Sequence, residues 1–318
     1  MSTFLQLLVT GIAMGFIYCM VAIEHTLVWK TTGLVNFAHD KFITLGAYFF
    51  GGTMCMLFPN NFLLAVLCTT VFMFLYGMLA ARAIFMPLSK MPQGIYAVTG
   101  CLMLSIIMRE GIRVIWGPAP FTVNNWLTGT IKLGDVVLPV VNIYIIVASI
   151  ILLVLQWLFF SKTRLGKSLT CVSQDKEVAA LMGINVNRSI AISVGISSML
   201  CGWIGMLVIP LFSINGNMAG TIAMKGFSAG VVGGFGTYAG AAVGGLFIGI
   251  LETLYTMFGP STYKDVVAYL LLIIFLIINP GGIMGVIADF GKKKKHKNGI
   301  AIARDYLFGK KDGEHNGE

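Results

Sequence analysis

Long stretches without a single charged side chain constrain this chain more than any other feature. Residues 66–76, 140–160 and 266–278 carry no charge. Only 11% of the 318 residues are charged, against roughly 25% in an ordinary soluble domain. A helix that crosses a bilayer needs about 20 mainly apolar residues, and several windows of this sequence meet that requirement. The sequence therefore predicts an all-α polytopic membrane protein, with residues 1–290 as one transmembrane domain.

The apolar segments predict eight or nine transmembrane helices, some of them short or broken. Seven are expected near residues 4–23, 42–58, 62–85, 95–116, 140–160, 189–212 and 263–278. Two shorter pieces, near 222–232 and 239–257, belong to a glycine-rich region. If both short pieces cross the membrane, the count is nine. If one of them is re-entrant, eight spans with both chain ends inside remain possible. The start of the chain has no basic n-region, so the first segment is expected to stay as a span.

The basic residues predict which side of the membrane each loop occupies. The formal net charge is +9, and eight of the Lys and Arg residues lie in the tail 291–318. With nine spans, 17 basic residues fall on the side of the tail and five on the opposite side. Because short basic loops stay in the cytoplasm, we expect a cytoplasmic C-terminus. The tail is expected to be a disordered anchor beside anionic lipid, which explains its charge better than nucleic-acid binding does.

Residues 161–188, here called the polar loop, form the longest charged interruption between two apolar segments. Ser173 or Asp175 can cap a helix start, and Gly183 can end it. We therefore expect a helix of about two turns over 175–182, which is too short to be stable in isolation. It must pack on its own protein or in the groove of a partner, and periodicity leaves both alternatives open. Its apolar side chains cluster on one side: Val178, Leu181 and Met182.

Motifs for catalysis and cofactor binding are absent from the sequence. Gly166-Lys167-Ser168 resembles the end of a phosphate-binding loop, but Ser161 stands where the first glycine would be, and no buried strand precedes it. There is no GxSxG or HExxH pattern and no paired Cys/His spacing. The six cysteines are scattered and are interpreted as small core residues. We expect no enzymatic activity, no metal and no cofactor.

Four ordered motifs carry a resemblance to a known family. They are Thr163-Arg164-Leu165-Gly166-Lys167 followed by residues 174–185, Asn36-Phe37-Ala38-His39 with Leu45-Gly46-Ala47-Tyr48, Gly233-Gly234-Phe235-Gly236 through Glu252, and Asn279-Pro280-Gly281-Gly282. Together they resemble the branched-chain amino-acid ABC permease family over about residues 8–285. Two positions depart from its pattern: Glu24 replaces a small or apolar residue, and Asp40 follows His39 where glycine is common.

The resemblance implies the permease subunit of an ATP-binding-cassette importer in the bacterial cytoplasmic (inner) membrane. Such a subunit translocates branched-chain or related amino acids that an extracytoplasmic binding protein delivers, and it pairs with a second, similar permease. Two cytoplasmic ATPase subunits hydrolyse the ATP. The resemblance does not fix which amino acid or amide is carried. It also does not fix whether the two permease subunits form a homodimer or a heterodimer. The family's coupling helix, which docks in the ATPase, would comprise Asp175, Lys176, Glu177, Val178, Ala179, Ala180, Leu181, Met182 and Gly183.

The alternative is an ion-coupled secondary transporter or channel for a small polar solute. Such a protein needs acids or histidines that face a cavity within the membrane, and this sequence is poor in such groups. Asn36 and His39 either line the transport pathway or serve as a helix-capping residue and a histidine near the cytoplasmic interface. Glu252, the only acid in its apolar segment, is expected in a structural ion pair or at the membrane interface rather than in contact with substrate.

Two further sets of residues have a structural and a functional interpretation. Arg109 and Arg113 share one helix face and either meet acidic groups of a binding protein, snorkel to lipid headgroups or pair with Glu252. The glycine ladder at 236, 240, 244, 245 and 249 predicts close helix packing, as does the Gly11/Gly15 spacing in the first segment. In the functional interpretation, an unwound turn borders the pathway at Gly233, Gly234 and Gly236.

Overall fold

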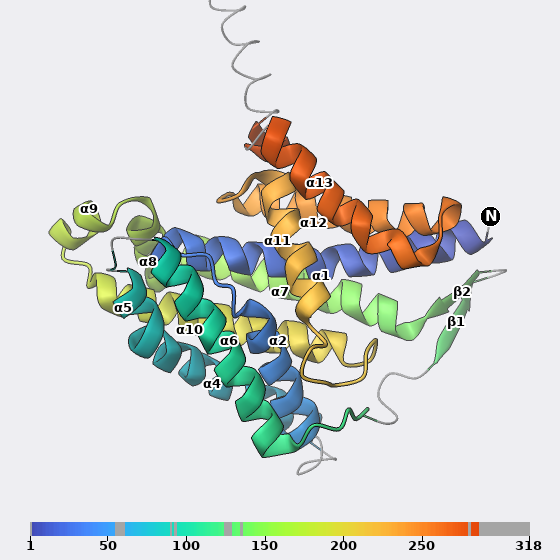
Figure 1. The fold of residues 1–318 in the computed structure, drawn as a ribbon, viewed down its shortest axis with the longest axis horizontal. Helices are drawn as coiled ribbons and strands as arrows, with labels where there is room; N and C mark the ends of the chain where they lie inside the picture. The colour runs from blue at the N-terminus through green and yellow to red at the C-terminus, as the bar shows by residue number, and fades with distance from the viewer. Residues whose placement is uncertain are drawn as a thin grey trace, which may run out of the picture.

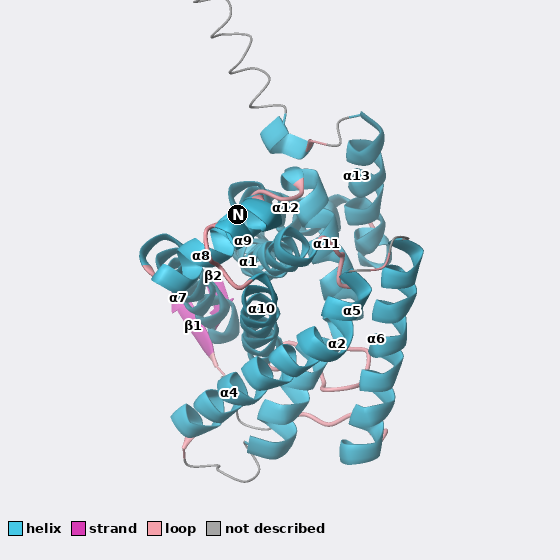
Figure 2. Cartoon of the chain, turned by 90° about the vertical axis from the view of Figure 1, so that its left-hand side faces the viewer, coloured by secondary structure: helices cyan, strands magenta, loops and turns pink. Residues whose placement is uncertain are grey.

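The computed structural model describes residues 2–54, 61–89, 91, 94–123, 129–133, 136–278 and 281–285. Within them the chain is a bundle of helices with one small β-hairpin (Figures 1 and 2). The predicted disordered tail 291–318 lies outside the described residues. The main helices are α1 (Ser2–Thr32), α4 (Phe62–Ala80), α6 (Gly94–Trp116), α7 (Val140–Lys162), α10 (Val186–Val208), α12 (Tyr238–Phe258) and α13 (Lys264–Ile278).

Seven described stretches are long and apolar enough to cross a membrane. They are Phe4–Thr32, Phe62–Ser89, Ile95–Trp116, Val140–Lys162, Val186–Val208, Tyr238–Phe258 and Ser261–Gly285. The second includes the π-helical η2 (Ala81–Phe85) and α5 (Met86–Ser89), and the last includes the 3-10 turn η3 (Ser261–Tyr263). An all-α polytopic membrane protein is therefore confirmed.

Two shorter helical segments lie where the sequence predicts further spans, and the number of crossings stays a prediction of eight or nine. One is α2 (His39–Ala47) with the π-helical η1 (Tyr48–Met54), and the other is α11 (Gly220–Gly234). The expected full second span is thus only a short, buried segment within the described residues. Conversely, the piece near 239–257, expected to be short, is the 21-residue helix α12.

The first helix is longer than predicted, and this is the main correction to the sequence-based fold. The first segment is expected to end near residue 23, but α1 continues through Glu24 and His25 to Thr32. A membrane helix can carry polar residues where neighbouring helices surround them, and both side chains are buried. The break comes at Gly33, whose φ of 81° suits a residue without Cβ.

Helix α1 lies in the middle of the bundle and packs against α7, α10, α11 and α12. Its contact with α12 is a backbone contact, as the small-residue spacing predicts. A Cβ added to Gly249 would overlap the backbone of Gly15, and one added to Gly245 would overlap that of Cys19. Small residues let membrane helices approach this closely. The same device joins α2 to α10, where Gly46 faces Gly202.

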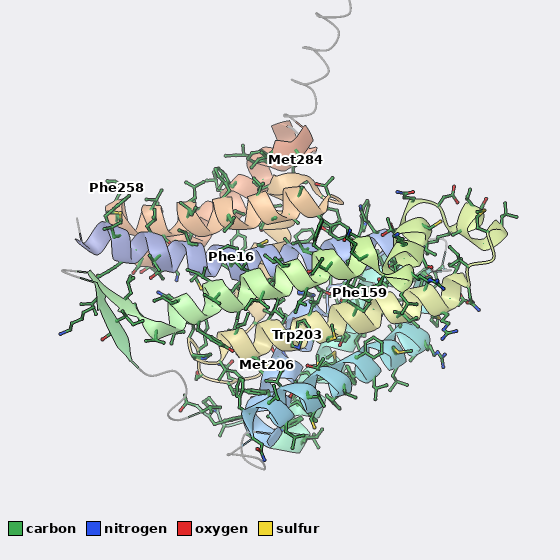
Figure 3. All side chains as sticks on the ribbon, turned by 180° about the vertical axis from the view of Figure 1, so that it is seen from behind. Phe16, Phe159, Trp203, Met206, Phe258 and Met284 are labelled. Atoms are coloured by element: carbon green, nitrogen blue, oxygen red, sulfur yellow. The ribbon has the colours of Figure 1, made fainter. Side chains whose placement is uncertain are left out.

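The outer surface of the bundle is covered by bulky apolar side chains (Figure 3). Phe258 at the end of α12 is 89% exposed. An apolar groove of about 270 Å³ between α7 and α10 is lined by residues that include Phe159 and Trp203. Apolar surface on this scale marks contact with lipid or with a partner rather than with water.

A small β-hairpin lies within residues 117–139. Strands β1 (Thr130–Leu133) and β2 (Val136–Pro139) pair antiparallel, with Thr130 opposite Pro139 and Leu133 opposite Val136. Phe121, ahead of the hairpin, forms a bridge with Ile214 in the loop before α11. At the opposite end of the bundle, the polar loop folds into α8 (Arg164–Gln174) and α9 (Lys176–Leu181) (Figure 1).

The α1–α12 contact can be tested by adding one methyl group. We expect Gly249→Ala to destabilise the protein by about 1–3 kcal/mol, because the methyl group overpacks two backbones, and to lower the melting temperature in detergent. Gly111→Ala in α6 is the matched control, since no heavy atom lies within 4 Å of the added Cβ. Alanine is also the better helix former. Equal melting temperatures for the two variants would contradict a backbone contact that tight.

Candidate functional site

A cavity of about 430 Å³ lies where the start of α2 meets α1, α6 and α11. Its size falls within the range of small-molecule sites. It is lined by His25, Val35, Asn36, Phe37, His39, Asp40, Leu102, Ser105, Gly220, Ala223, Met224 and Phe227. The segment 33–40 supplies most of the polar groups, while α6 and α11 supply mainly apolar ones. The cavity therefore has one polar and one apolar side.

The polar side exists because the chain leaves the helical conformation between α1 and α2. After Gly33 the backbone runs without helix to Ala38, and the Oδ1 atom of Asn36 accepts a hydrogen bond from the Ala38 N–H at 3.0 Å. Asn36 is 4% exposed, so it supports this turn from inside the protein. Asn36 thus stabilises the turn before α2 and also lines the cavity. From the sequence, a helix-capping role and a place along the pathway are two separate interpretations of this residue.

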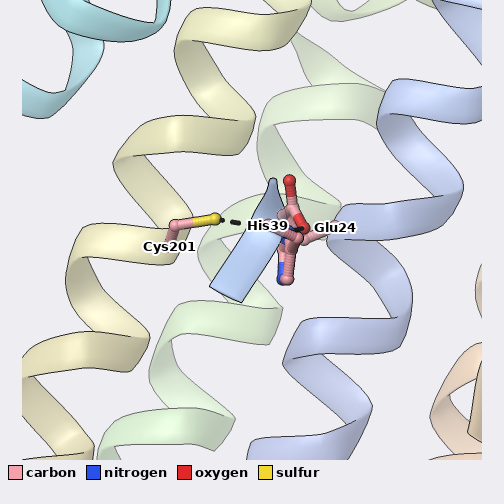
Figure 4. Close-up of side chains that lie close together, drawn as sticks. All are labelled: Glu24, His39 and Cys201. Atoms are coloured by element: carbon pink, nitrogen blue, oxygen red, sulfur yellow. Dashed lines mark hydrogen bonds and ion pairs between the residues drawn. The ribbon is translucent and has the colours of Figure 1, made fainter. Parts of the chain in front are cut away.

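His39, the first residue of α2, belongs to a buried polar cluster (Figure 4). Its Nδ1 atom pairs with Oε2 of Glu24 and lies 3.6 Å from Sγ of Cys201. The other carboxylate oxygen of Glu24 accepts a hydrogen bond from Ser197. His25 Nδ1 is 3.5 Å from Glu24 Oε2. The cluster joins α1, α2 and α10 beside the cavity.

The three glycines assigned to the pathway with Asn36 and His39 do not line this cavity. Gly233 packs against the backbone of Gly240, and Gly236 packs against the ring of Trp29. Gly234 lies near the carbonyl oxygen of Gly281. These residues end α11 and form the turn into α12. The structure thus brings Asn36 and His39 together and leaves Gly233, Gly234 and Gly236 in a separate packing contact.

A second buried polar network holds four helices together. Lys225 on α11 forms ion pairs of 2.6 Å with Glu252 on α12 and with Asp265 on α13. Tyr18 on α1 donates a hydrogen bond of 2.9 Å to Glu252. The predicted structural ion pair of Glu252 is confirmed. Its main partner is Lys225, which is the one charged residue of α11.

Arg109 and Arg113 lie near the end of α6, with side chains 41% and 52% exposed. Each contacts Glu110, at 3.0 and 3.2 Å, respectively. Neither is paired with Glu252 among the described contacts. Because one acid faces two cations, this patch keeps a positive charge.

The expected helix in the polar loop is present as α9. The carboxylate of Asp175 accepts hydrogen bonds from the N–H groups of Glu177 and Val178 at 2.8 and 3.0 Å. Gly183 follows the helix with a φ of 81°. Ala179 packs inward, while Leu181 and Met182 are 86% and 75% exposed. The helix therefore presents apolar side chains beyond the surface of the protein.

The sequence analysis missed the helix that precedes α9. Thr163 caps α8 by accepting a hydrogen bond from the Gly166 N–H at 3.0 Å. Leu169 and Val172 lie buried on one side of α8. Their three-residue spacing among polar neighbours was the signal that could have identified it.

A hydrogen bond connects α9 to the break after α1. Lys176 Nζ donates to the carbonyl oxygen of Thr32 at 3.0 Å. Thr32 is the last residue of α1, and the segment after it forms the polar wall of the cavity. Partial burial removes water from the Lys176 ammonium group and lowers its pKa. The exposed helix and the cavity are therefore linked through one side chain.

The helices of membrane-spanning length surround a cavity that is large enough for a small solute. The polar loop presents a capped helix with exposed apolar side chains. Together these features define a polytopic membrane transport protein. Residues 7–276 match the family model described as branched-chain amino acid transport system / permease component. The chain belongs to this family.

Curated relatives resemble it over almost their whole length. The chain is 28% identical to the high-affinity branched-chain amino acid transport system permease protein LivH of Salmonella typhimurium, over 89% of this chain and 96% of the relative. LivH of Escherichia coli K12 shows the same identity and coverage. BraD of Pseudomonas aeruginosa is also 28% identical, with coverage of 89% and 96%.

Proposed function

We propose that this chain is the permease subunit of an ATP-driven importer for branched-chain or related amino acids. The family supports a permease, and the names of its relatives support that cargo. The observation that carries the mechanism is α9, a capped helix whose apolar side chains are exposed at one end of the bundle. ATP hydrolysis belongs to two partner subunits, and a second permease of the same kind completes the pathway.

Helix α9 acts as the coupling helix that docks in the ATPase. Leu181 and Met182, with Val178, offer an apolar surface suited to a hydrophobic groove. The Asp175 cap and the contact of Lys176 with Thr32 fix the helix against α1. A shift of α9 on ATP binding would pull on the break at Gly33, which borders the cavity. A conformational change in the ATPase would thus change the position of the cavity wall.

The cavity suits an amino acid with an aliphatic side chain. Leu102, Met224 and Phe227 offer apolar surface to that side chain. Asp40 also lines the cavity. Its Oδ2 pairs with Lys41 at 2.9 Å, while its Oδ1 is buried without a hydrogen-bond partner among the described residues and can receive the ammonium group of the cargo. Asn36 and His39 lie on the same wall.

The proposed topology places the polar loop in the cytoplasm. Figure 1 shows α8 and α9 at one end of the bundle and the N-terminus at the other. Nine crossings, with the two short segments included, put the N-terminus outside and the C-terminus inside a bacterial cytoplasmic membrane. The basic tail then lies on the same side as the polar loop, in agreement with the charge bias.

The docking role of α9 can be tested by truncating one side chain. We expect Leu181→Ala to weaken co-purification of the ATPase at least tenfold, because an interface anchor contributes about 2 kcal/mol or more. ATP-dependent uptake into vesicles should fall in parallel. The matched control is Leu165→Ala, which truncates an exposed leucine on the neighbouring α8. Uptake that persists with no ATPase present would contradict the importer and favour an ion-coupled transporter.

The role of the cavity in transport can be tested by placing a larger side chain in it. We expect Met224→Trp to abolish most substrate uptake, because the larger side chain occupies the space that the cargo needs, while the ATPase still co-purifies. Val243→Trp in α12 adds the same ring at a position 44% exposed on the surface, and its uptake should match that of the wild type. Normal transport by the filled variant would place the pathway elsewhere.

The positive patch on α6 is proposed to contact the extracytoplasmic binding protein. We expect reversal of both charges, Arg109→Glu with Arg113→Glu, to weaken binding-protein capture and to make it less dependent on salt, because electrostatic attraction is lost. Replacement of both residues by lysine retains the charge and is the control. Unchanged capture by the reversed variant would leave the arginines a role at the lipid surface.

A further inference from the structure

The buried cluster beside the cavity contains a set of metal-binding side chains that sequence spacing does not show. Glu24, His39 and Cys201 each offer one ligand atom, and these atoms all lie within 4.8 Å of one another. The residues come from α1, α2 and α10, and all three are buried. In sequence they are far apart, so no paired motif exists.

One distance in the cluster matches a tetrahedral zinc site. Zinc bonds of about 2.0–2.3 Å place neighbouring ligand atoms roughly 3.3–3.7 Å apart. Cys201 Sγ lies 3.6 Å from His39 Nδ1. Glu24 and His39 are in closer contact, so that contact would have to open around an ion. Three protein ligands leave a fourth position for water, as in catalytic zinc sites.

Charge balance favours a divalent ion at this depth. A carboxylate from Glu24 and a thiolate from Cys201 carry two negative charges, and the neutral imidazole of His39 carries none. A divalent cation makes the assembly neutral overall, which limits the cost of burying charge in a low dielectric. Binding releases two protons, one from the Cys201 thiol and one from the Glu24–His39 pair.

The cluster has one buried nitrogen without a partner, and it borders the cavity. His39 Nε2 is buried, and no hydrogen bond to it is found among the described residues. The rings of His39 and His25 are in contact, with centroids 4.0 Å apart. Both histidines line the cavity, so an ion that enters the cavity reaches them directly. A free imidazole nitrogen can then hydrogen-bond water and orient the liganded ring.

We propose that Glu24, His39 and Cys201 form an intramembrane site for a divalent ion of the zinc class. Carboxylate, imidazole and thiolate together select zinc over calcium or magnesium, which prefer oxygen ligands alone. A bound ion ties α1, α2 and α10 together at the cavity wall. The proposal is independent of the cargo and of the ATPase partners.

Cobalt(II) is the probe that reports these ligands directly. The full-length chain, purified in detergent with its co-expressed partner subunits, is stripped with a chelator and titrated with Co²⁺. We expect a saturable absorption spectrum with tetrahedral d–d bands and a thiolate-to-cobalt charge-transfer band, both displaced by Zn²⁺. Cys201→Ser should remove the charge-transfer band, and Glu24→Gln should weaken Co²⁺ binding by about 100-fold or more.

Cys68→Ser is the matched control, because it removes a half-buried thiol on α4 that lies outside the cluster. Its spectrum should equal that of the wild type. X-ray absorption of the zinc-loaded wild type, which needs no variant, should show one sulfur with nitrogen and oxygen ligands. A charge-transfer band that survives Cys201→Ser, or a zinc shell without sulfur, would overturn the proposal.

Discussion

The approach of α1 to α12 is the contact on which the rest of the structure depends. Lipid tails are as apolar as leucine, so membrane helices gain little from burying apolar surface and must gain from packing. Gly15 and Gly249 bring the two backbones together, and Gly245 extends the contact to Cys19. With α12 so close, α1 occupies the centre of the bundle. The remaining helices then arrange themselves around it.

Because α1 is central, it connects regions that would otherwise be independent. Tyr18 reaches the ion-pair network of Glu252, and Glu24 reaches His39 on α2. At its end, Thr32 accepts a hydrogen bond from Lys176 of α9. One helix thus contacts the ion-pair network, the cavity and the exposed helix α9. This arrangement suits a protein in which an event at one end must alter a cavity inside.

Polar groups within the bundle are placed where several helices meet. An isolated charge within the hydrocarbon region is costly, yet Lys225 and Glu24 are both buried. Lys225 has two acidic partners, Glu252 and Asp265, on different helices, which gives it a structural role. Glu24 instead faces two histidines and a cysteine beside a cavity. Because their neighbours differ, Lys225 is interpreted as part of a structural ion pair and Glu24 as part of a candidate binding site.

The sequence by itself determined the membrane class, most helix positions and the capped helix α9, because apolar runs, caps and glycine spacing are local signals. It also indicated a partner for Glu252, since a lone buried acid needs one, but it did not identify Lys225. Only the tertiary structure decided that α1 continues past Glu24, that Gly233 packs away from the cavity, and that Cys201 lies beside His39. These outcomes depend on which helices become neighbours, and burial by residues distant in the sequence leaves no local pattern.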